Sequence, residues 1–129
     1  MERIKLHDKY FIPSIPNREI EEAIEKLGKK ISDDYRDKEH PLFLSVLNGS
    51  FMFTASLMKS IDIQAEVSFI KLSSYDGTES TGCVKQLLGL NKNVKGRNVL
   101  IVEDIVDTGN TIVELVKLLQ EAGASDIKV

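Results

Sequence analysis

The sequence predicts an α/β fold in which helices flank a mainly parallel sheet. Two short and nearly continuous apolar runs, at 42–47 and 99–102, are typical of strands that are buried on both faces. Each run is followed by a segment with helical character, and this alternation of strands and helices indicates a parallel sheet. The 129 residues are enough for one domain of ordinary size, so we expect residues 1–129 to form a single domain.

An irregular lead-in and one helix are expected before the first strand. Residues 1–16 include Pro13 and Pro16 and predict irregular chain. Asn17 is a candidate N-cap for a helix whose apolar residues recur at steps of three and four. These residues are Ile20, Ile24, Leu27 and Ile31. The spacing predicts one buried stripe, and the polar stretch 32–41 is expected to end the helix as a loop.

The middle of the chain predicts a helix, a strand and a loop that returns to a further strand. Residues 51–60 have helical character, and the strict alternation over 61–69 predicts a half-buried strand. The stretch 73–82 is rich in glycine and hydroxyl groups, so it predicts a mobile loop. Residues 83–90 are the expected returning strand.

The last part of the chain predicts a central strand, a helix and the start of another strand. The central strand covers 99–102, and apolar residues at helical spacing follow from Ile112 to Leu119. Gly123 is the expected C-cap of that helix. Residues 126–129 begin a strand.

Composition and charge exclude several classes of protein. A net charge of −3 offers no general attraction to nucleic acid or to an anionic membrane. No apolar run approaches the roughly 20 residues of a membrane-spanning helix, and the charged N-terminus is unlike a secretory signal. The single cysteine, Cys83, rules out an internal disulfide. We therefore expect a cytoplasmic protein with no nucleic-acid partner and no membrane partner.

Two carboxylates follow the central strand directly. Glu103 and Asp104 come after the apolar run 99–102, and in open α/β sheets ligands bind beyond the carboxyl ends of the strands. Carboxylates accept hydrogen bonds from the hydroxyl groups of a sugar. They are also the oxygen ligands that Mg²⁺ prefers. The pair therefore indicates a sugar diol together with Mg²⁺.

A candidate phosphate-binding segment comes next. Residues 107–111 supply hydroxyl groups, a glycine and backbone N–H groups at the start of a helix. These groups and the helix dipole together favour an anion. With Glu103 and Asp104, the segment points to a phosphorylated sugar as the ligand. For Asp107 taken alone, a purely structural role as a helix cap stays open.

Three segments resemble a known family. The string VLIVEDIVDTGNT, residues 99–111, resembles the phosphoribosyl-pyrophosphate signature of the type I phosphoribosyltransferases. The segment 47–50 is similar to the pyrophosphate loop of the hypoxanthine-guanine phosphoribosyltransferases of purine salvage. Residues 73–82 resemble the flexible active-site loop of the same family. The resemblance covers essentially the whole chain and implies the type I phosphoribosyltransferase fold.

The resemblance implies a transferase reaction and assigns its catalytic and sugar-binding residues. Family members are pentosyltransferases that move the 5-phosphoribosyl group from phosphoribosyl pyrophosphate to a purine base and release pyrophosphate. Hypoxanthine and guanine as bases would give IMP and GMP. Glu103 and Asp104 would hold the ribose hydroxyls and the Mg²⁺, and Asp107 would be the general base at N7 of the purine. The 5′-phosphate would lie on Asp107, Thr108, Gly109, Asn110 and Thr111.

The resemblance also assigns two loops. Leu47, Asn48 and Gly49 would bind pyrophosphate, and the peptide bond between Leu47 and Asn48 would be cis. The flexible loop would begin at Ser73, Ser74 and Tyr75 and close over the site, where it would exclude water. A homodimer or homotetramer is the assembly that the resemblance implies.

The chain departs from the family pattern at three places. Many relatives carry lysine where this chain has Asn48 and Asn110, so charge neutralisation at these positions is in doubt. Relatives also continue beyond the position of Val129 with the residues that read the purine, so the resemblance implies that residues 1–129 lack the C-terminal part of the family fold. The alternatives are a type I relative that uses another base and a regulatory nucleotide-binding protein with the same fold. A purine-salvage transferase is the leading hypothesis.

Overall fold

The computed structural model describes residues 3–74, 84–88, 93–106 and 109–129. Its centre is a five-stranded sheet in the order β5-β4-β3-β6-β7. Strands β4, β3, β6 and β7 are parallel neighbours, and β5 is an antiparallel edge strand, so the predicted α/β fold is confirmed. The strands are β3 (Leu42–Leu47), β4 (Glu66–Ser74), β5 (Val84–Leu88), β6 (Asn98–Val102) and β7 (Asp126–Lys128).

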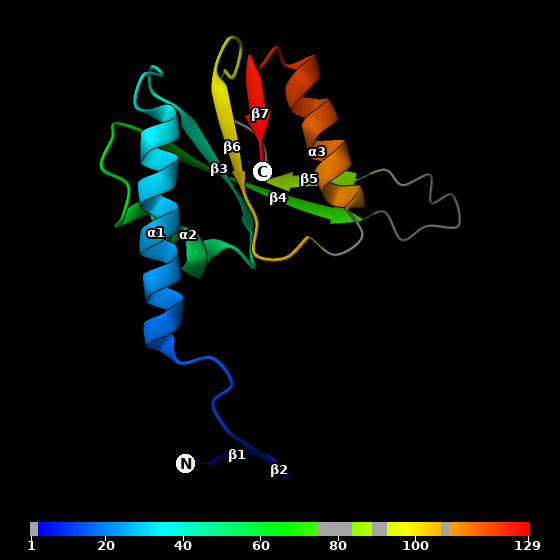
Figure 1. The fold of residues 1–129 in the computed structure, drawn as a ribbon. Helices are drawn as coiled ribbons and strands as arrows, with labels where there is room; N and C mark the ends of the chain where they lie inside the picture. Colours follow the sequence, from blue (N-terminus) through cyan, green and yellow to red (C-terminus); the bar gives the residue numbers. More distant parts are fainter. Residues whose placement is uncertain (1–2, 75–83, 89–92, 107–108) are drawn as a thin grey trace.

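Helices cover both faces of this sheet (Figure 1). One face packs against α1 (Asn17–Tyr35) and α2 (Phe51–Met58), and the other packs against α3 (Asn110–Glu121). The central strand β3 contributes to both cores, because successive side chains of a strand point to opposite faces. Leu42 and Leu44 face α3, whereas Phe43 faces α1 and α2, and all three are fully buried. Burial of each such side chain stabilises the fold by about 1.5–3 kcal/mol.

The first helix is longer than the sequence indicated. The predicted loop at 32–41 was wrong at its start, because α1 continues to Tyr35. Ser32 and Tyr35 are both buried, and Tyr35 belongs to the core between the sheet and helices α1 and α2. The Tyr35 ring meets Phe43 edge-on at 6.3 Å between ring centroids. Burial of the helix face that carries Ser32 and Tyr35 stabilises the helix there, although the sequence from residue 32 onward is mostly polar. The helix begins after Pro16, and Asn17 is its first residue rather than its N-cap.

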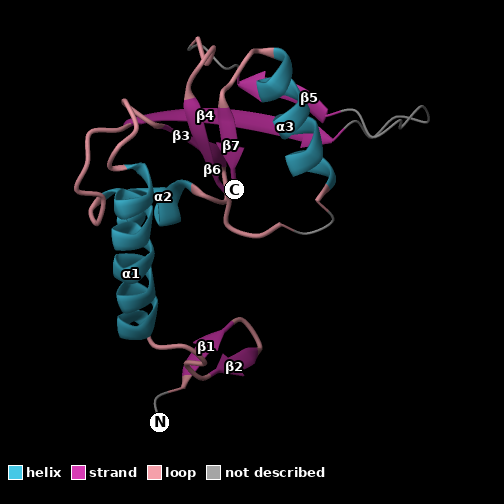
Figure 2. Cartoon of the chain, turned by 45° about the horizontal axis from the view of Figure 1, so that its top comes forward, coloured by secondary structure: helices cyan, strands magenta, loops and turns pink. Residues whose placement is uncertain are grey.

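The predicted buried stripe of α1 holds only at its C-terminal end. Ile31 is 9% exposed, whereas Ile20 and Leu27 are 45% and 39% exposed. The N-terminal half of α1 extends past the edge of the five-stranded sheet, so no strand of that sheet packs against it (Figure 1). The residues before it, expected to be irregular, form an antiparallel hairpin of β1 (Ile4–Leu6) and β2 (Lys9–Phe11). This hairpin stands apart from the main sheet (Figure 2).

The strand predicted at 61–69 starts and ends later. Parallel pairing with β3 begins at Glu66, opposite Leu42, so the residues at 61–65 precede the strand. At its other end β4 continues to Ser74, because β5 pairs with it from Val84 onward. The returning strand expected at 83–90 is confirmed as β5 over residues 84–88.

The final helix, α3, ends one residue earlier than predicted: its C-cap is Ala122, and Gly123 is the residue that follows the cap. Gly123 has a φ of +90°, the left-handed conformation that glycine adopts without a steric penalty. Its N–H donates to Gln120 at 3.0 Å, and the next N–H, of Ala124, donates to Leu119 at 3.1 Å. These two bonds satisfy carbonyl groups that the helix end would leave free.

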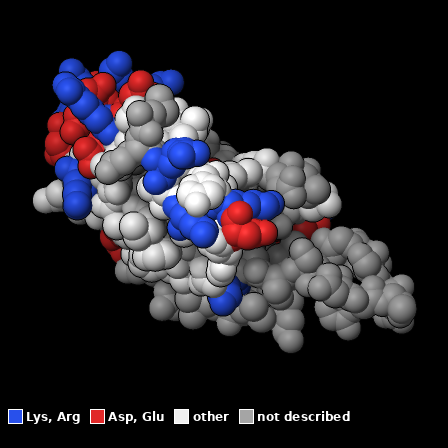
Figure 3. Space-filling view, turned by 90° about the horizontal axis from the view of Figure 1, so that it is seen from below, with Lys and Arg blue, Asp and Glu red and all other residues white. Residues whose placement is uncertain are grey.

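The surface carries charges of both signs. Seen from below, basic and acidic side chains of the described residues lie close to one another rather than in separate fields (Figure 3). No helix within the described ranges is both long enough and apolar enough to cross a bilayer.

Candidate active site

Two loops meet where β3 and β6 end. The two strands are parallel neighbours, and Ser45 of β3 is level with Val102 of β6. The segment after β3 carries Gly49, and the segment after β6 carries Asp104. A Cβ atom on Gly49 would lie only 2.4 Å from Asp104 Oδ2, so the glycine backbone packs directly against this carboxylate. The structure thus brings together two of the segments that the sequence singled out.

The loop after β3 has the conformation that the family resemblance implied. The peptide bond between Leu47 and Asn48 is cis, although the second residue is not proline. The backbone then turns into α2, where the N–H of Phe51 donates to the Asn48 carbonyl at 3.3 Å. Asn48 and Gly49 are both exposed, so the loop is open to a ligand.

The acid pair Glu103 and Asp104 is electrostatically coupled. The Asp104 N–H donates to Glu103 Oε1 at 3.1 Å. Burial of the Glu103 carboxyl, with a further contribution from the Asp104 side chain, raises its pKa to about 7. Hydrogen bonding to the Glu103 side chain, followed by the Ile105 backbone amide, lowers the pKa of the exposed Asp104 carboxyl. Asp104 is therefore ionised at neutral pH, while Glu103 holds its proton part of the time.

The acid pair fits a divalent cation that is shared with a substrate. Carboxylate oxygens are ligands for Mg²⁺, and Mg²⁺ in enzymes is typically held by one or two carboxylates together with substrate phosphates and water. Among the residues that the structure describes, no three His, Cys, Asp or Glu side chains form a metal-binding group. Within the described ranges, Glu103 and Asp104 thus offer a partial site that a phosphorylated ligand would complete.

The predicted phosphate segment leads into α3. Gly109 has a φ of +86° and precedes the first helical residue, Asn110. A Cβ atom at Gly109 would meet nothing within 4 Å, so glycine is favoured here by backbone conformation and not by crowding. Its carbonyl accepts a hydrogen bond from the Val113 N–H at 2.9 Å, which closes the first turn. Asp107 and Thr108 lie outside the described residues, so their predicted roles stay predictions.

The predicted flexible loop is only partly described. Ser73 and Ser74 are the last two residues of β4 and pair with Lys85 and Val84, so the loop predicted to begin at Ser73 starts after Ser74. Their predicted role in closing the site stays a prediction. Pairing with β5 keeps them in the sheet, which their small polar side chains did not indicate. Tyr75 lies outside the described residues.

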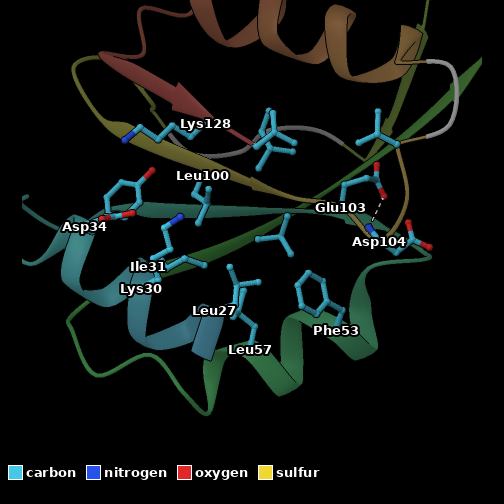
Figure 4. A pocket seen from close by; sticks show the side chains of 15 residues that line it. Leu27, Lys30, Ile31, Asp34, Phe53, Leu57, Leu100, Glu103, Asp104 and Lys128 are labelled. Atoms are coloured by element: carbon cyan, nitrogen blue, oxygen red, sulfur yellow. Dashed lines mark hydrogen bonds between the residues drawn. The ribbon is translucent and has the colours of Figure 1, made fainter. Parts of the chain in front are cut away.

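A cavity of about 450 Å³, which the sequence did not reveal, adjoins the acid pair. Figure 4 shows Glu103 and Asp104 at one end and Asp34 and Lys128 at the other. The wall between them is mainly apolar and includes Leu27, Phe53, Leu57, Leu100 and Val102. Tyr35 also lines the cavity, and burial, followed by the charges of Asp126 and Asp34, raises the pKa of its hydroxyl.

Residues 15–129 match the family described as phosphoribosyl transferase domain. The chain belongs to this family. It is 45% identical over 105 residues to the hypoxanthine-guanine phosphoribosyltransferase of Streptococcus pyogenes, which covers 81% of this chain and 58% of that protein. It is also 45% identical over 112 residues to the enzyme of the same name from Lactococcus lactis, with 86% and 61% covered. The chain thus spans about three-fifths of the curated relatives that it matches.

Solved structures of phosphoribosyltransferases share the fold of this chain. A hypoxanthine-guanine phosphoribosyltransferase from Bacillus anthracis superposes with a TM-score of 0.83 at 34% identity, covering 92% of this chain and 70% of that one. The hypoxanthine phosphoribosyltransferase from Trypanosoma cruzi, in complex with its product IMP, gives a TM-score of 0.77 at 35% identity. That match covers 85% of this chain and 63% of that one. The phosphoribosyltransferase fold that the sequence predicted is therefore confirmed.

Proposed function

We propose that this chain carries the phosphoribosyl-transfer site of a hypoxanthine-guanine phosphoribosyltransferase. The reaction moves the 5-phosphoribosyl group of phosphoribosyl pyrophosphate to a 6-oxopurine, giving IMP or GMP and pyrophosphate in purine salvage. The observation that carries the proposal is the packing of Gly49 against Asp104, which joins the loop after β3 to the acid pair. The names of the relatives support the 6-oxopurine as the acceptor.

The acid pair has the chemistry that the sugar requires. When the bond between the anomeric carbon and the pyrophosphate oxygen breaks, positive charge develops on the ribose ring. Carboxylates near the ring stabilise that charge and accept hydrogen bonds from the 2′- and 3′-hydroxyls. We assign this role to Glu103 and Asp104. The ionised Asp104 supplies a full negative charge, and Glu103 can donate or accept a hydrogen bond because its pKa is near neutrality.

Two backbone segments would hold the phosphate groups. The loop at 47–49 would bind pyrophosphate through its N–H groups, and Gly109 to Thr111 would bind the 5′-phosphate at the start of α3. Asn48 and Asn110 offer amide groups without positive charge, so phosphate binding depends on backbone donors and on a cation.

That cation is Mg²⁺ in this proposal, held by Glu103 and Asp104. When bound, it supplies positive charge that stabilises the leaving pyrophosphate.

Asp107 is the proposed general base. It would accept the proton that the purine loses at N7 as the new bond to the anomeric carbon forms. The assignment rests on the family resemblance.

The proposed setting of the enzyme is a cytoplasmic homodimer or homotetramer. Several apolar side chains near the site are exposed and would suit a contact between subunits. Phe51 and Met52, at the start of α2, are 56% and 66% exposed, and Ile105 and Val106 are 75% and 51% exposed.

A direct assay tests the proposed function. The protein is incubated with phosphoribosyl pyrophosphate, Mg²⁺ and each of hypoxanthine, guanine, xanthine and uracil, and nucleotide formation is measured. We expect turnover of hypoxanthine and guanine that Asp107→Asn abolishes. Turnover of another base alone would identify a different type I relative. Nucleotide binding without turnover of any base would favour the regulatory alternative.

A further inference from the structure

Three buried hydroxyl groups lie directly next to the loop at 47–49. Ser45 comes from β3, Ser50 directly precedes α2, and Thr54 lies within α2; their exposed fractions are 0%, 0% and 3%. Ser45 Oγ is 2.7 Å from Ser50 Oγ and 2.7 Å from Thr54 Oγ1. The Ser50 hydroxyl also donates to the backbone carbonyl of Val46. Together they form a continuous set of hydrogen bonds, here called the hydroxyl chain.

The hydroxyl chain has one consistent direction, because each hydroxyl has a single proton to donate. Ser50 donates its proton to the Val46 carbonyl, so it must accept the proton of Ser45. Ser45 then has no second proton, so Thr54 must be the donor in the contact between Ser45 and Thr54. Ser45 is therefore the central link, since its hydroxyl bonds to both of the other two hydroxyls.

The hydroxyl chain closes the loop from both of its ends. Val46 precedes the loop and Ser50 follows it, and the Ser50 backbone N–H also points to the Val46 carbonyl at 3.4 Å. Ser45 itself pairs with Val102, the residue that precedes the acid pair in β6. The buried Ser45 side chain thus connects β3, the neighbour of the strand that leads to the acid pair, with α2, the helix after the loop at 47–49. Because Gly49 packs against Asp104, a shift of the loop would change the space in which that carboxylate lies.

We propose that Ser45 is a positioning residue, whose buried hydroxyl holds the loop at 47–49 in the conformation that faces the acid pair. Removal of its side-chain oxygen would leave the Thr54 proton without an acceptor and the Ser50 oxygen without its donor. Buried polar groups that lose their partners rearrange to recover them, so the loop would relax toward other conformations. The effect on substrate binding rests on the proposed function, whereas the effect on the loop does not.

Kinetics with a matched control provide the first test. Ser45→Ala is compared with Ser32→Ala, because Ser32 is also fully buried and its hydroxyl accepts one hydrogen bond, from the Asp62 N–H at 3.1 Å, far from the loop. We expect Ser45→Ala to raise the KM for phosphoribosyl pyrophosphate about tenfold, the effect of one buried hydrogen bond. The KM for hypoxanthine should stay within about twofold. An unchanged KM for phosphoribosyl pyrophosphate, or an equal rise in Ser32→Ala, would overturn the proposal.

Amide hydrogen exchange provides a test that needs no substrate. The Ser50 N–H should exchange about tenfold faster in Ser45→Ala than in the unsubstituted protein, and at an unchanged rate in Ser32→Ala. Equal exchange in both variants would refute the role of Ser45 in shaping the loop. If the protein does not bind phosphoribosyl pyrophosphate, the proposed function fails, and the exchange measurement still decides the role of Ser45.

Two further variants test the order of donors in the hydroxyl chain and keep the proposal testable if Ser45→Ala does not fold. Thr54→Val removes only the outermost donor and should leave the Ser50 exchange rate within about twofold. A rate as fast as that of Ser45→Ala would contradict Ser45 as the central link. Ser50→Ala cuts the last link and should raise the same KM about tenfold, which supplies the answer if Ser45→Ala does not fold.

Discussion

Substitution of Gly49 by alanine should change the geometry of the proposed site with little effect on the stability of the fold. The added Cβ would lie 2.4 Å from Asp104 Oδ2, 2.8 Å from its Cγ and 2.9 Å from its Oδ1. Ordinary van der Waals contact starts at 3.4 Å, so the carboxylate must move by about 1 Å. Asp104 is exposed and can rotate into solvent, so the chain should still fold. The change therefore acts on the position of one carboxylate of the proposed site.

The expected size of the effect follows from that displacement. A misplacement of about 1 Å in an active site can lower the rate about 100-fold, which corresponds to about 2.7 kcal/mol of transition-state stabilisation. We expect Gly49→Ala to lower kcat/KM for phosphoribosyl pyrophosphate by about this factor, while the free energy of unfolding falls by less than about 1 kcal/mol. Steady-state kinetics and urea unfolding measure the two quantities.

A second glycine provides the control. A Cβ atom on Gly28 would lie 2.5 Å from the Cβ of Ser60 and 2.9 Å from its carbonyl oxygen, a clash of similar size with less freedom to relax. Gly28→Ala should lower the free energy of unfolding by about 1–3 kcal/mol and leave kcat/KM of the folded protein unchanged. Undiminished kcat/KM in Gly49→Ala would refute the reasoning that joins the loop to the acid pair.

Three other predictions concern charge, packing and metal. In the metal-free protein the raised pKa of Glu103 contributes stability that is fully present below pH 4.5, its ordinary pKa, and is lost as the pH rises through about 7. The free energy of unfolding in urea, measured across this pH range, should therefore depend less on pH in Glu103→Gln. An identical pH dependence in the two proteins would contradict the raised pKa of Glu103. Phe43→Ala should lower the free energy of unfolding by about 3–5 kcal/mol, because Phe43 is fully buried. Phe69→Ala should lower it clearly less, because the Phe69 side chain is 40% exposed. Equal urea midpoints for the two variants would contradict the burial of Phe43 in the core. Nucleotide formation should stop in excess chelator and return with Mg²⁺, and undiminished turnover in chelator would defeat the proposed metal dependence.

The parts of the fold that the sequence predicted well are those where one physical effect dominates. The apolar runs 42–47 and 99–102 within β3 and β6 are nearly continuous, interrupted by Ser45, because both faces of the sheet are covered. Gly123 predicted the end of α3 because only glycine adopts its backbone conformation at low cost. Glu103 and Asp104 could be predicted as ligand-binding residues because two carboxylates directly after a buried strand seldom contribute to the stability of the fold.

The features that the sequence did not predict depend on contacts between distant segments. Tyr35 extends α1 because it packs on Phe43, and no local pattern contains that contact. Ser74 belongs to β4 only because β5 pairs with it. The packing of Gly49 against Asp104 requires the register of two parallel strands, which a sequence without coordinates does not specify.

The central claim is that three separate segments form one site for phosphoribosyl pyrophosphate. Titration of the ¹⁵N-labelled protein with this compound and Mg²⁺, followed by amide chemical shifts, tests it most directly. We predict that the amides of Gly49, Asp104 and Gly109 shift together with one dissociation constant, and that omission of Mg²⁺ weakens all three responses. Shifts confined to one segment, or three different dissociation constants, would contradict the claim.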